Sequence, residues 1–205
     1  MKILGIYGSV RTPGNTRWMM DKLLDSAKTE GSNIEKVFLK ELKIKYCVGC
    51  DACKSNDGNC IIKDDGMQEV YPKLLWADVI ILGSPNYFKN VSGPVKNFID
   101  RTNAFVRPRP RKLKGKYAIG LSVGGEELED IQHCEDALVR FFNGHKMKIL
   151  KMIKVKADEP NDARNIVGLE QHIVELGKGI VQNETLTMFD FQLNKSKVYA
   201  ENIPK

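Results

Sequence analysis

Short apolar runs alternate along the chain with longer segments whose apolar residues recur at helical spacing, and this alternation restricts the fold more than any other feature. The apolar runs occupy residues 3–7, 34–39, 79–82, 117–123 and 147–155. The helical segments occupy residues 15–27, 67–76, 94–104, 128–142 and 161–181. Continuous apolar strands separated by helices are typical of a parallel sheet that is covered on both faces. The sequence therefore predicts an α/β domain with a doubly wound, five-stranded parallel sheet.

The 205 residues are enough for one such domain, which needs no disulfide bonds to bury its apolar surface. We assign residues 1–181 to this domain. Two of the helices have an apolar face that should pack on the sheet, with Trp18, Met19, Met20, Leu23, Leu24 and Ala27 in the first and Val70, Leu74 and Leu75 in the second. Residues 182–205 mix apolar and polar side chains, and this tail is predicted to be a domain-covering arm or an oligomer contact.

Charge and hydropathy restrict where the protein works and what it binds. The apolar run after Met1 is too short for a signal peptide and no stretch approaches a membrane span, which predicts a cytoplasmic protein without a membrane partner. The formal charge is +6, with six basic residues in 107–116. Only Phe105 and Tyr117 flank them, so the interleaved stacking aromatics of a nucleic-acid surface are missing and no nucleic-acid partner is expected. A solvated loop, an acidic electron-transfer partner or a phosphate-bearing cofactor would account for the stretch.

An anion-binding loop is predicted directly after the first strand, where residues 8–16 read Gly-Ser-Val-Arg-Thr-Pro-Gly-Asn-Thr. The following helix would present unpaired N–H groups and the positive end of its dipole, while Ser9, Arg11 and Thr16 add further donors. The loop lacks the Walker Gly-Lys-Ser/Thr and the Gly-x-Gly-x-x-Gly dinucleotide pattern. The alternative is an ordinary capped turn in which Asn15 or Thr16 is the N-cap.

Two more loops should meet the first one, because ligands of doubly wound sheets bind at the carboxyl ends of the strands. The loop predicted at 83–94 offers Tyr87 and Phe88 as flat walls, although ordinary loop packing would also explain them. The loop at 122–126 contains Gly124 and Gly125, which permit close approach of the backbone to a ligand.

Four of the five cysteines fall within fourteen residues, at Cys47, Cys50, Cys53 and Cys60. Thiolates are soft ligands for iron or zinc, and a reducing compartment makes lasting disulfides improbable. The even C-x2-C-x2-C spacing favours an iron–sulfur centre over structural zinc, which more often pairs two C-x2-C units across a longer loop. Zinc and free or regulatory thiols remain the alternatives.

The remaining reactive residue types are predicted to be structural. Cys134 lies on an apolar helical stripe and is expected in the core, where a free cysteine behaves as a small hydrophobe. Asp65 precedes a helix and is predicted to cap it. The three histidines, at 133, 145 and 172, are isolated from one another, and no catalytic triad is visible, so hydrolysis has no support.

Taken together, the motifs resemble those of the NADPH-dependent FMN reductase superfamily of flavodoxin-like proteins, and the cysteine run is similar to that of its iron-sulfur flavoproteins. The resemblance covers about residues 1–181. It is carried by Gly8-Ser9-x-Arg11-x-x-Gly14-Asn15-Thr16, the cysteine run continuing into Lys63-Asp64-Asp65-Gly66-Met67, Gly83-Ser84-Pro85-x-Tyr87-Phe88 and Lys96-x-Phe98-Ile99-Asp100-Arg101.

The resemblance implies a flavodoxin-like fold with strand order 2-1-3-4-5 and a bound FMN. The implied cofactor-binding residues are Ser9, Arg11, Gly14, Asn15 and Thr16 at the phosphate, Pro85, Asn86, Tyr87, Phe88 and Asn90 at the isoalloxazine and ribityl region, and Ser122 and Gly124 near the other ring edge. Cys47, Cys50, Cys53 and Cys60 would hold a [4Fe-4S] cluster.

The same resemblance implies an oxidoreductase that takes electrons from a ferredoxin-like donor and reduces oxygen, peroxide or a quinone. It also implies a homodimer or homotetramer. One alternative is a cluster-free reductase of FMN or quinones that uses NAD(P)H directly. The other is a non-enzymatic electron carrier, or a redox sensor based on thiols or zinc.

Overall fold

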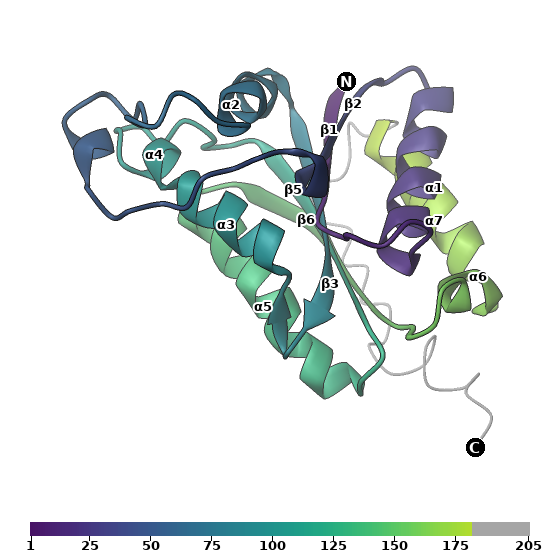
Figure 1. Ribbon diagram of the computed structural model, residues 1–205. Helices are drawn as coiled ribbons and strands as arrows, with labels where there is room; N and C mark the ends of the chain where they lie inside the picture. Colours follow the sequence, from purple (N-terminus) through teal and green to yellow (C-terminus); the bar gives the residue numbers. More distant parts are fainter. Residues whose placement is uncertain (182–205) are drawn as a thin grey trace.

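A computed structural model describes residues 1–181, and the tail at 182–205 lies outside the described residues. The predicted role of that tail therefore stays a prediction. The strands are β1 Lys2–Tyr7, β2 Asn33–Phe38, β3 Val79–Tyr87, β4 Asn90–Val91, β5 Tyr117–Gly124 and β6 Lys148–Lys156. Five of them form a parallel sheet in the order β2-β1-β3-β5-β6, while the short β4 pairs antiparallel with β3 (Figure 1). Without β4 this is the predicted order 2-1-3-4-5, so the predicted fold is confirmed.

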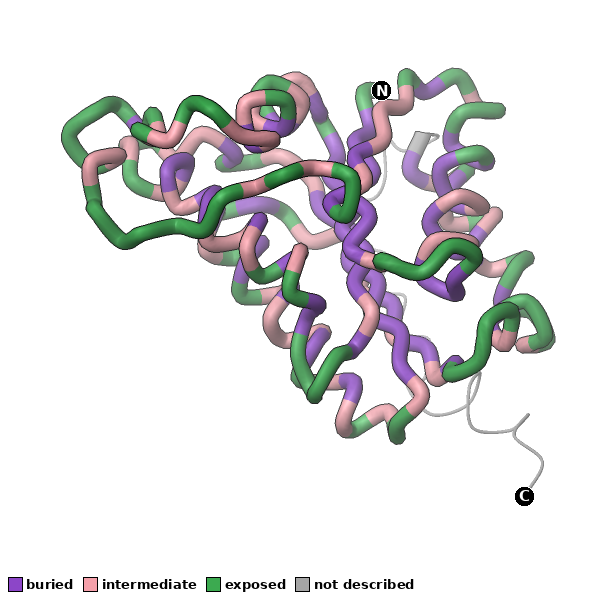
Figure 2. The backbone as a smooth tube through the Cα atoms, viewed as in Figure 1, coloured by how far each residue is buried: buried purple, intermediate pink, exposed green. Residues whose placement is uncertain are grey.

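Helices cover both faces of the sheet, as the alternating sequence pattern predicted. They are α1 Asn15–Thr29, α2 Met67–Trp76, α3 Gly93–Arg101, α4 Asn103–Val106, α5 Leu128–Gly144, α6 Asp162–Asn165 and α7 Leu169–Val181. Helices α1, α6 and α7 lie on one side of the sheet, whereas α2, α3, α4 and α5 lie on the other (Figure 1). The central strands β1, β3 and β5 are buried nearly throughout, whereas most residues of the edge strands β2 and β6 are half-buried (Figure 2).

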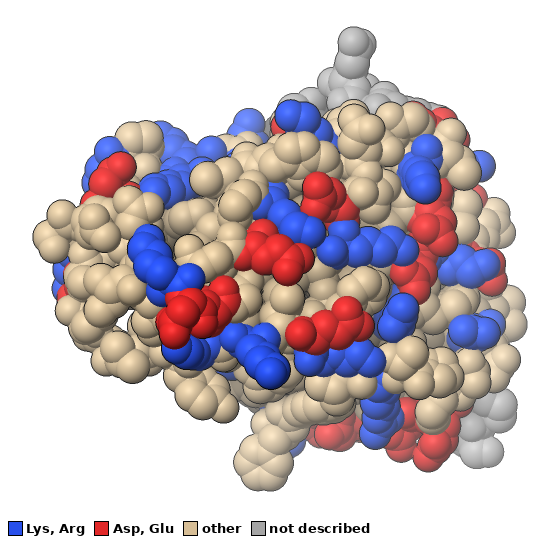
Figure 3. Space-filling model, turned by 45° about the horizontal axis from the view of Figure 1, so that its top comes forward, with Lys and Arg blue, Asp and Glu red and all other residues tan. Residues whose placement is uncertain are grey.

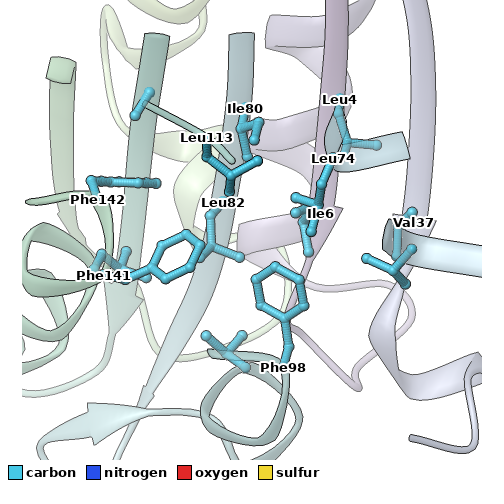
Figure 4. Close-up of a cluster of buried hydrophobic side chains, with 14 of the residues drawn as sticks. Leu4, Ile6, Val37, Leu74, Ile80, Leu82, Phe98, Leu113, Phe141 and Phe142 are labelled. Carbon is cyan, nitrogen blue, oxygen red and sulfur yellow. The ribbon is translucent and has the colours of Figure 1, made fainter. Parts of the chain in front are cut away.

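Each face of the sheet has its own apolar core. The larger core joins Leu4, Ile80 and Leu82 of the strands to Phe98 of α3 and Phe142 of α5 (Figure 4). The core on the other face takes the predicted apolar side of α1, whose Met19, Met20, Leu23, Leu24 and Ala27 are fully buried. Burying about 25 cal/mol per Å² of apolar surface on both faces is the main stabilisation of such a sheet.

Three predictions about the helices differ from the structure. Leu75 is 47% exposed, although Val70 and Leu74 of the same helix are buried, because a residue adjacent to a buried position points about 100° further round the helix. The predicted helix at 161–181 is two helices, since Gly168 at φ +78° separates α6 from α7. The predicted helix at 94–104 also divides at Thr102, between α3 and α4.

The third strand is longer than predicted, and this moves part of a predicted loop into the sheet. Residues 83–87 continue β3, because Gly83, Ser84 and Pro85 pair in register with Leu121, Ser122 and Val123 of β5. The chain then reverses into β4 at Phe88 and Lys89, which both have positive φ, +52° and +58°. Such a turn matches the twist of an antiparallel hairpin, although it is unusual for a residue as bulky as phenylalanine.

His145 is buried next to Thr102, at the junction of α3 and α4. Its surroundings favour the neutral imidazole, so we expect the protein to lose stability in acid. The Thr102 hydroxyl donates to the Ile99 carbonyl at 2.7 Å, so its 3.0 Å contact with Nε2 makes that nitrogen the donor. Nδ1 is then a buried acceptor without a partner among the described residues. Burial, together with the smaller effect of the Arg111 charge, lowers the pKa of His145 from its ordinary 6.5 to about 4.

The pKa of His145 is lower in the folded protein than in the unfolded chain. The contribution of neutral His145 to folding stability is therefore complete above about pH 6.5 and declines as the pH falls from about 6.5 towards 4. We predict that urea unfolding between pH 7 and pH 4.5 will show a loss of roughly 2 kcal/mol that His145→Gln does not share. The exposed His133, changed to Gln, is the matched control and should retain the wild-type profile. An unchanged profile in His145→Gln would contradict this assignment.

Candidate functional site

A cavity of about 520 Å³ opens at the carboxyl ends of the parallel strands, between the segments that follow β1, β3, β5 and β6. This is the edge where doubly wound sheets bind ligands. Ser9, Arg11, Gly14, Asn15, Thr16, Pro85, Asn86, Tyr87, Phe88, Val123, Gly124, Gly125, Glu126, Ala157 and Asp158 line the cavity. The three predicted loops therefore meet at one site.

The first loop leaves the start of α1 open to a ligand. Gly14 is the N-cap, with extended backbone, and no side chain caps the helix. Unpaired N–H groups at a helix start favour bound anions. The predicted alternative, with Asn15 or Thr16 as the cap, is therefore wrong. Asn15 instead donates from Nδ2 to the Glu159 carbonyl at 2.9 Å and accepts from the Ala163 N–H at 3.3 Å, because the segment after β6 lies against it.

Arg11 carries a positive charge on this loop, and its exposed guanidinium donates to the Asp158 carbonyl at 3.3 Å. Ser9 Oγ accepts from the Arg11 N–H at 3.2 Å, which keeps the hydroxyl beside the helix start. The loop itself is held against β3, because the Gly8 N–H donates to the Gly83 carbonyl at 2.8 Å. A Cβ on Gly8 would lie 2.1 Å from Val95 Cγ2, so only glycine allows this approach. A cationic side chain thus stands next to unpaired backbone donors.

The hairpin of β3 and β4 forms the opposite rim. Phe88 is fully exposed at the positive-φ turn, and Tyr87 is 37% exposed. An exposed aromatic side chain in a strained turn is a feature that binding sites use, because folding alone gains nothing from it. Below the rim, Asn86 Nδ2 donates to Glu126 Oε2 at 2.9 Å, while its Oδ1 is buried without a partner among the described residues.

Two predicted site residues lie away from this cavity. Ser122 is fully buried and its hydroxyl donates to the Ile153 carbonyl at 3.4 Å. Asn90 is exposed beyond the turn, and its Oδ1 accepts the neighbouring Val91 N–H at 2.8 Å. Sequence reasoning missed Ala157 and Asp158, which follow β6 and line the cavity. The rule that parallel strands end at one edge was the signal that could have found them.

The four clustered cysteines lie elsewhere, in a segment that projects beyond the sheet beside α4 (Figure 1). We call residues 46–61 the cysteine loop, which includes the short helix η2 Ala52–Lys54. Cys47, Cys50, Cys53 and Cys60 line one small pocket with Arg101. Cys47 and Cys50 are exposed and the other two are half-buried. Within residues 1–181, no three His, Cys, Asp or Glu side chains are grouped closely enough to hold a metal ion as they stand.

Cys134 and Asp65 were both predicted to have structural roles, and the structure confirms the first prediction and modifies the second. Cys134 is fully buried, and burial raises the pKa of its thiol to about 12, which confirms it as a core residue. Asp65 accepts the Met67 N–H at 3.2 Å, but Gly66 occupies the N-cap position of α2. The missed role of Asp65 is an ion pair with Arg101, in which both side chains are fully buried.

The distribution of charged side chains can be followed over one face of the molecule (Figure 3). Basic and acidic side chains alternate over the face drawn in Figure 3, so that face carries no continuous basic band. Among the described helices, none has the length and apolar character required to cross a bilayer.

The strand order of the parallel sheet, the helices on both of its faces and the cavity at the carboxyl ends of its strands define a flavodoxin-like protein. The NADPH-dependent FMN reductase family matches residues 1–162, and the chain belongs to that family. An iron-sulfur flavoprotein of Methanocaldococcus jannaschii is 38% identical over 126 residues, which are 62% of this chain and 63% of the relative. A second iron-sulfur flavoprotein of that organism is 36% identical over 156 residues, or 73% of this chain and 76% of the relative.

The relatives confirm the predicted resemblance to the iron-sulfur flavoproteins within this family. The solved structure of a flavodoxin from the domain Archaea superposes with a TM-score of 0.56 at 17% identity, covering 89% of this chain and 97% of that one, which supports the fold alone. This chain matches only 63% and 51% of the length of two of the curated relatives.

Proposed function

We propose that the cavity binds FMN and that the protein is an FMN-dependent oxidoreductase. The observation that carries this proposal is the open start of α1, where no side chain caps the backbone donors and Arg11 stands beside them. Ser9, Gly14, Thr16 and the backbone of Asn15 complete a cradle for a phosphate. The Asn15 side chain is already bonded to the segment after β6, so it would contribute through its N–H alone.

The rest of the cavity suits a flat, partly polar ring. Pro85, Tyr87 and Phe88 offer apolar surface on one side, and Gly124 offers backbone on the other. The volume of about 520 Å³ falls inside the usual range of roughly 300–1,000 Å³ for sites of small ligands. Ser122 and Asn90 are assigned no contact in this arrangement, because neither lines the cavity.

Bound FMN would supply transfer of one or two electrons, while the protein holds and orients it. The exposed rim at Phe88 leaves room for a small acceptor such as oxygen, peroxide or a quinone. Reduction of a quinone to its hydroquinone needs two electrons and two protons. We infer that two molecules of a ferredoxin-like donor provide the electrons one at a time and that solvent provides the protons.

We further propose that the cysteine loop holds a [4Fe-4S] cluster, which would supply single-electron transfer. The donor set fits, because the four thiols of the C-x2-C-x2-C-x6-C run line one pocket. Cluster binding requires the thiols to move closer together than they stand. The loop permits such movement, because η2 is its sole regular element and positive φ at Gly49, Asp51, Asp57 and Gly58 makes it a series of turns. The two relatives from Methanocaldococcus jannaschii are named iron-sulfur flavoproteins, which supports an iron–sulfur cluster in the cysteine loop.

The family name favours a second candidate, a cluster-free reductase that takes hydride directly from NAD(P)H. In this candidate the cysteine loop holds zinc or free thiols. A third candidate, an electron carrier or redox sensor without a dedicated substrate, would reduce acceptors no faster than free FMN does. We infer a homodimer or homotetramer for each of them from the family resemblance.

Removal of the Arg11 guanidinium tests the phosphate cradle. We predict that Arg11→Ala weakens FMN binding about tenfold to a hundredfold, because a charge-assisted hydrogen bond contributes roughly 1.5–3 kcal/mol. Riboflavin, which lacks the phosphate, should bind both proteins equally in fluorescence titrations. The exposed Arg140 on α5, changed to Ala, is the control and should leave FMN affinity unchanged. Equal FMN affinity in wild type and Arg11→Ala would argue against this cradle.

Loss of one thiol tests the cluster. We predict that anaerobically prepared wild type contains iron and labile sulfide in equal amounts, with little zinc and one FMN per chain. Cys50→Ala should lose most of the iron, because one iron of the cubane would be left without a thiolate ligand and the cluster would become labile. Cys134→Ala removes a buried core thiol and should keep its iron. Stoichiometric zinc without sulfide would instead support the zinc alternative.

The donor separates the two enzyme candidates. We expect reduction of a quinone to be faster with a reduced ferredoxin-like carrier than with NADPH alone, measured by steady-state absorbance under anaerobic conditions. The comparison should be repeated with Cys50→Ala, in which any turnover that depends on NADPH alone would persist. Full turnover with NADPH and no added carrier would favour the cluster-free reductase.

A further inference from the structure

Arg101 is the last residue of α3, and its charged side chain is fully buried. Its guanidinium forms an ion pair with the equally buried Asp65 through Nη1 and Oδ2, and Nη2 donates to Oδ1 at 3.3 Å. The Tyr71 hydroxyl donates to the Arg101 carbonyl at 2.9 Å and holds the end of the helix in place. Burying a guanidinium is costly unless a carboxylate and hydrogen-bond acceptors compensate its charge. We therefore ask what the buried pair of Arg101 and Asp65 holds in place.

The pair lies where the two ends of the cysteine loop come together. We call residues 43–45 and 62–66 the loop stem. Arg101 Nη1 donates to the Lys45 carbonyl at 2.6 Å on one side of the stem, and Nη2 donates to the Ile62 carbonyl at 3.5 Å on the other. Asp65 Oδ2 also accepts the Lys45 N–H at 2.9 Å. One buried ion pair therefore joins both sides of the stem.

The same guanidinium reaches the cysteines. Nη2 lies 3.6 Å from Cys60 Sγ, within donor distance of a sulfur acceptor, and Arg101 lines the pocket that the four thiols surround. Its Nε is buried without a partner among the described residues. A second arginine near the loop, Arg107, is exposed and donates a hydrogen bond to Asp51 of the loop at 3.4 Å. Of these two arginines, Arg101 is the one that contacts both the loop stem and a thiol.

We propose that Arg101 and Asp65 form a clamp that closes the loop stem and positions Cys60 for the cluster. This inference rests on the proposed function for the cluster and adds the residues that prepare its site. Groups that hold metal ligands in place commonly change metal affinity by about tenfold to a hundredfold when they are removed. Lysine cannot replace the arginine here, because a single ammonium lacks the planar fork that reaches Asp65, both stem carbonyls and the sulfur.

The test compares three variants of the full chain with wild type. Arg101→Lys keeps the charge and removes the fork. The double variant Arg101→Gln, Asp65→Asn removes both charges together, so that no buried charge is left unpaired. Arg107→Gln is the matched control, because it removes an exposed arginine that contacts the same loop. FMN retention reports whether each variant is folded, since the FMN cavity contains neither residue of the clamp.

Two measurements are made on each protein. Amide hydrogen exchange in the metal-free form reports closure of the stem at the Lys45 and Gly66 N–H groups, which are bonded to Asp65 and to the Lys43 carbonyl. Iron release to a chelator reports cluster retention after anaerobic reconstitution with iron and sulfide. We expect exchange in the stem and iron release each to be about tenfold faster in the double variant. Arg101→Lys should be intermediate, and Arg107→Gln should match wild type.

The outcomes separate this inference from the proposed function. Unchanged exchange in the stem of an FMN-retaining double variant would overturn the clamp. Faster exchange with unchanged iron release would overturn its role in positioning Cys60. If wild type takes up FMN but no iron or sulfide, the cluster assignment fails, and with it the positioning role, while the exchange data still judge the closure of the stem. If the double variant loses FMN, Arg101→Lys decides the same questions.

Discussion

Burial of the parallel sheet on both faces is the constraint on which the rest of the structure depends. Once helices cover both sides, polar chemistry has no place on the faces of the strands, and only their ends remain for a ligand. The carboxyl ends of β1, β3, β5 and β6 share one edge, so four segments distant in sequence surround a single cavity. Fold and site are therefore consequences of the same alternating sequence pattern.

The sequence predicted those features that depend on local patterns. The apolar face of α1 and the burial of Cys134 follow from helical spacing, and both are confirmed. The strand order was implied by family resemblance and is also confirmed. In contrast, Gly83 to Pro85 look like a turn, yet they extend β3 because β5 supplies partners for the whole stretch. Pairing with a distant strand overrides the local preference of these residues.

The features that sequence reasoning missed depend on contacts between segments far apart in the chain. The Asn15 amide bonds residues more than 140 positions away, so its local pattern as a helix cap gave the wrong role. Asp158 enters the cavity only because β6 ends beside β5. The pair of Arg101 and Asp65 was visible as two motif residues, but their shared burial depends on how α3 meets the loop stem. The spacing of residues along one helix or strand cannot reveal such tertiary contacts.

The closed stem also determines how the length of the cysteine loop affects the rest of the domain. The two sides of the stem approach closely enough for the Gly66 N–H to bond the Lys43 carbonyl at 3.2 Å, so the cysteine loop leaves the domain and returns at nearly the same point. Loop length has only a weak effect on the entropy of closing a chain at fixed ends. The length of the thiol-bearing segment can therefore change at a small entropic cost, while the edge of the sheet that forms the cavity stays intact.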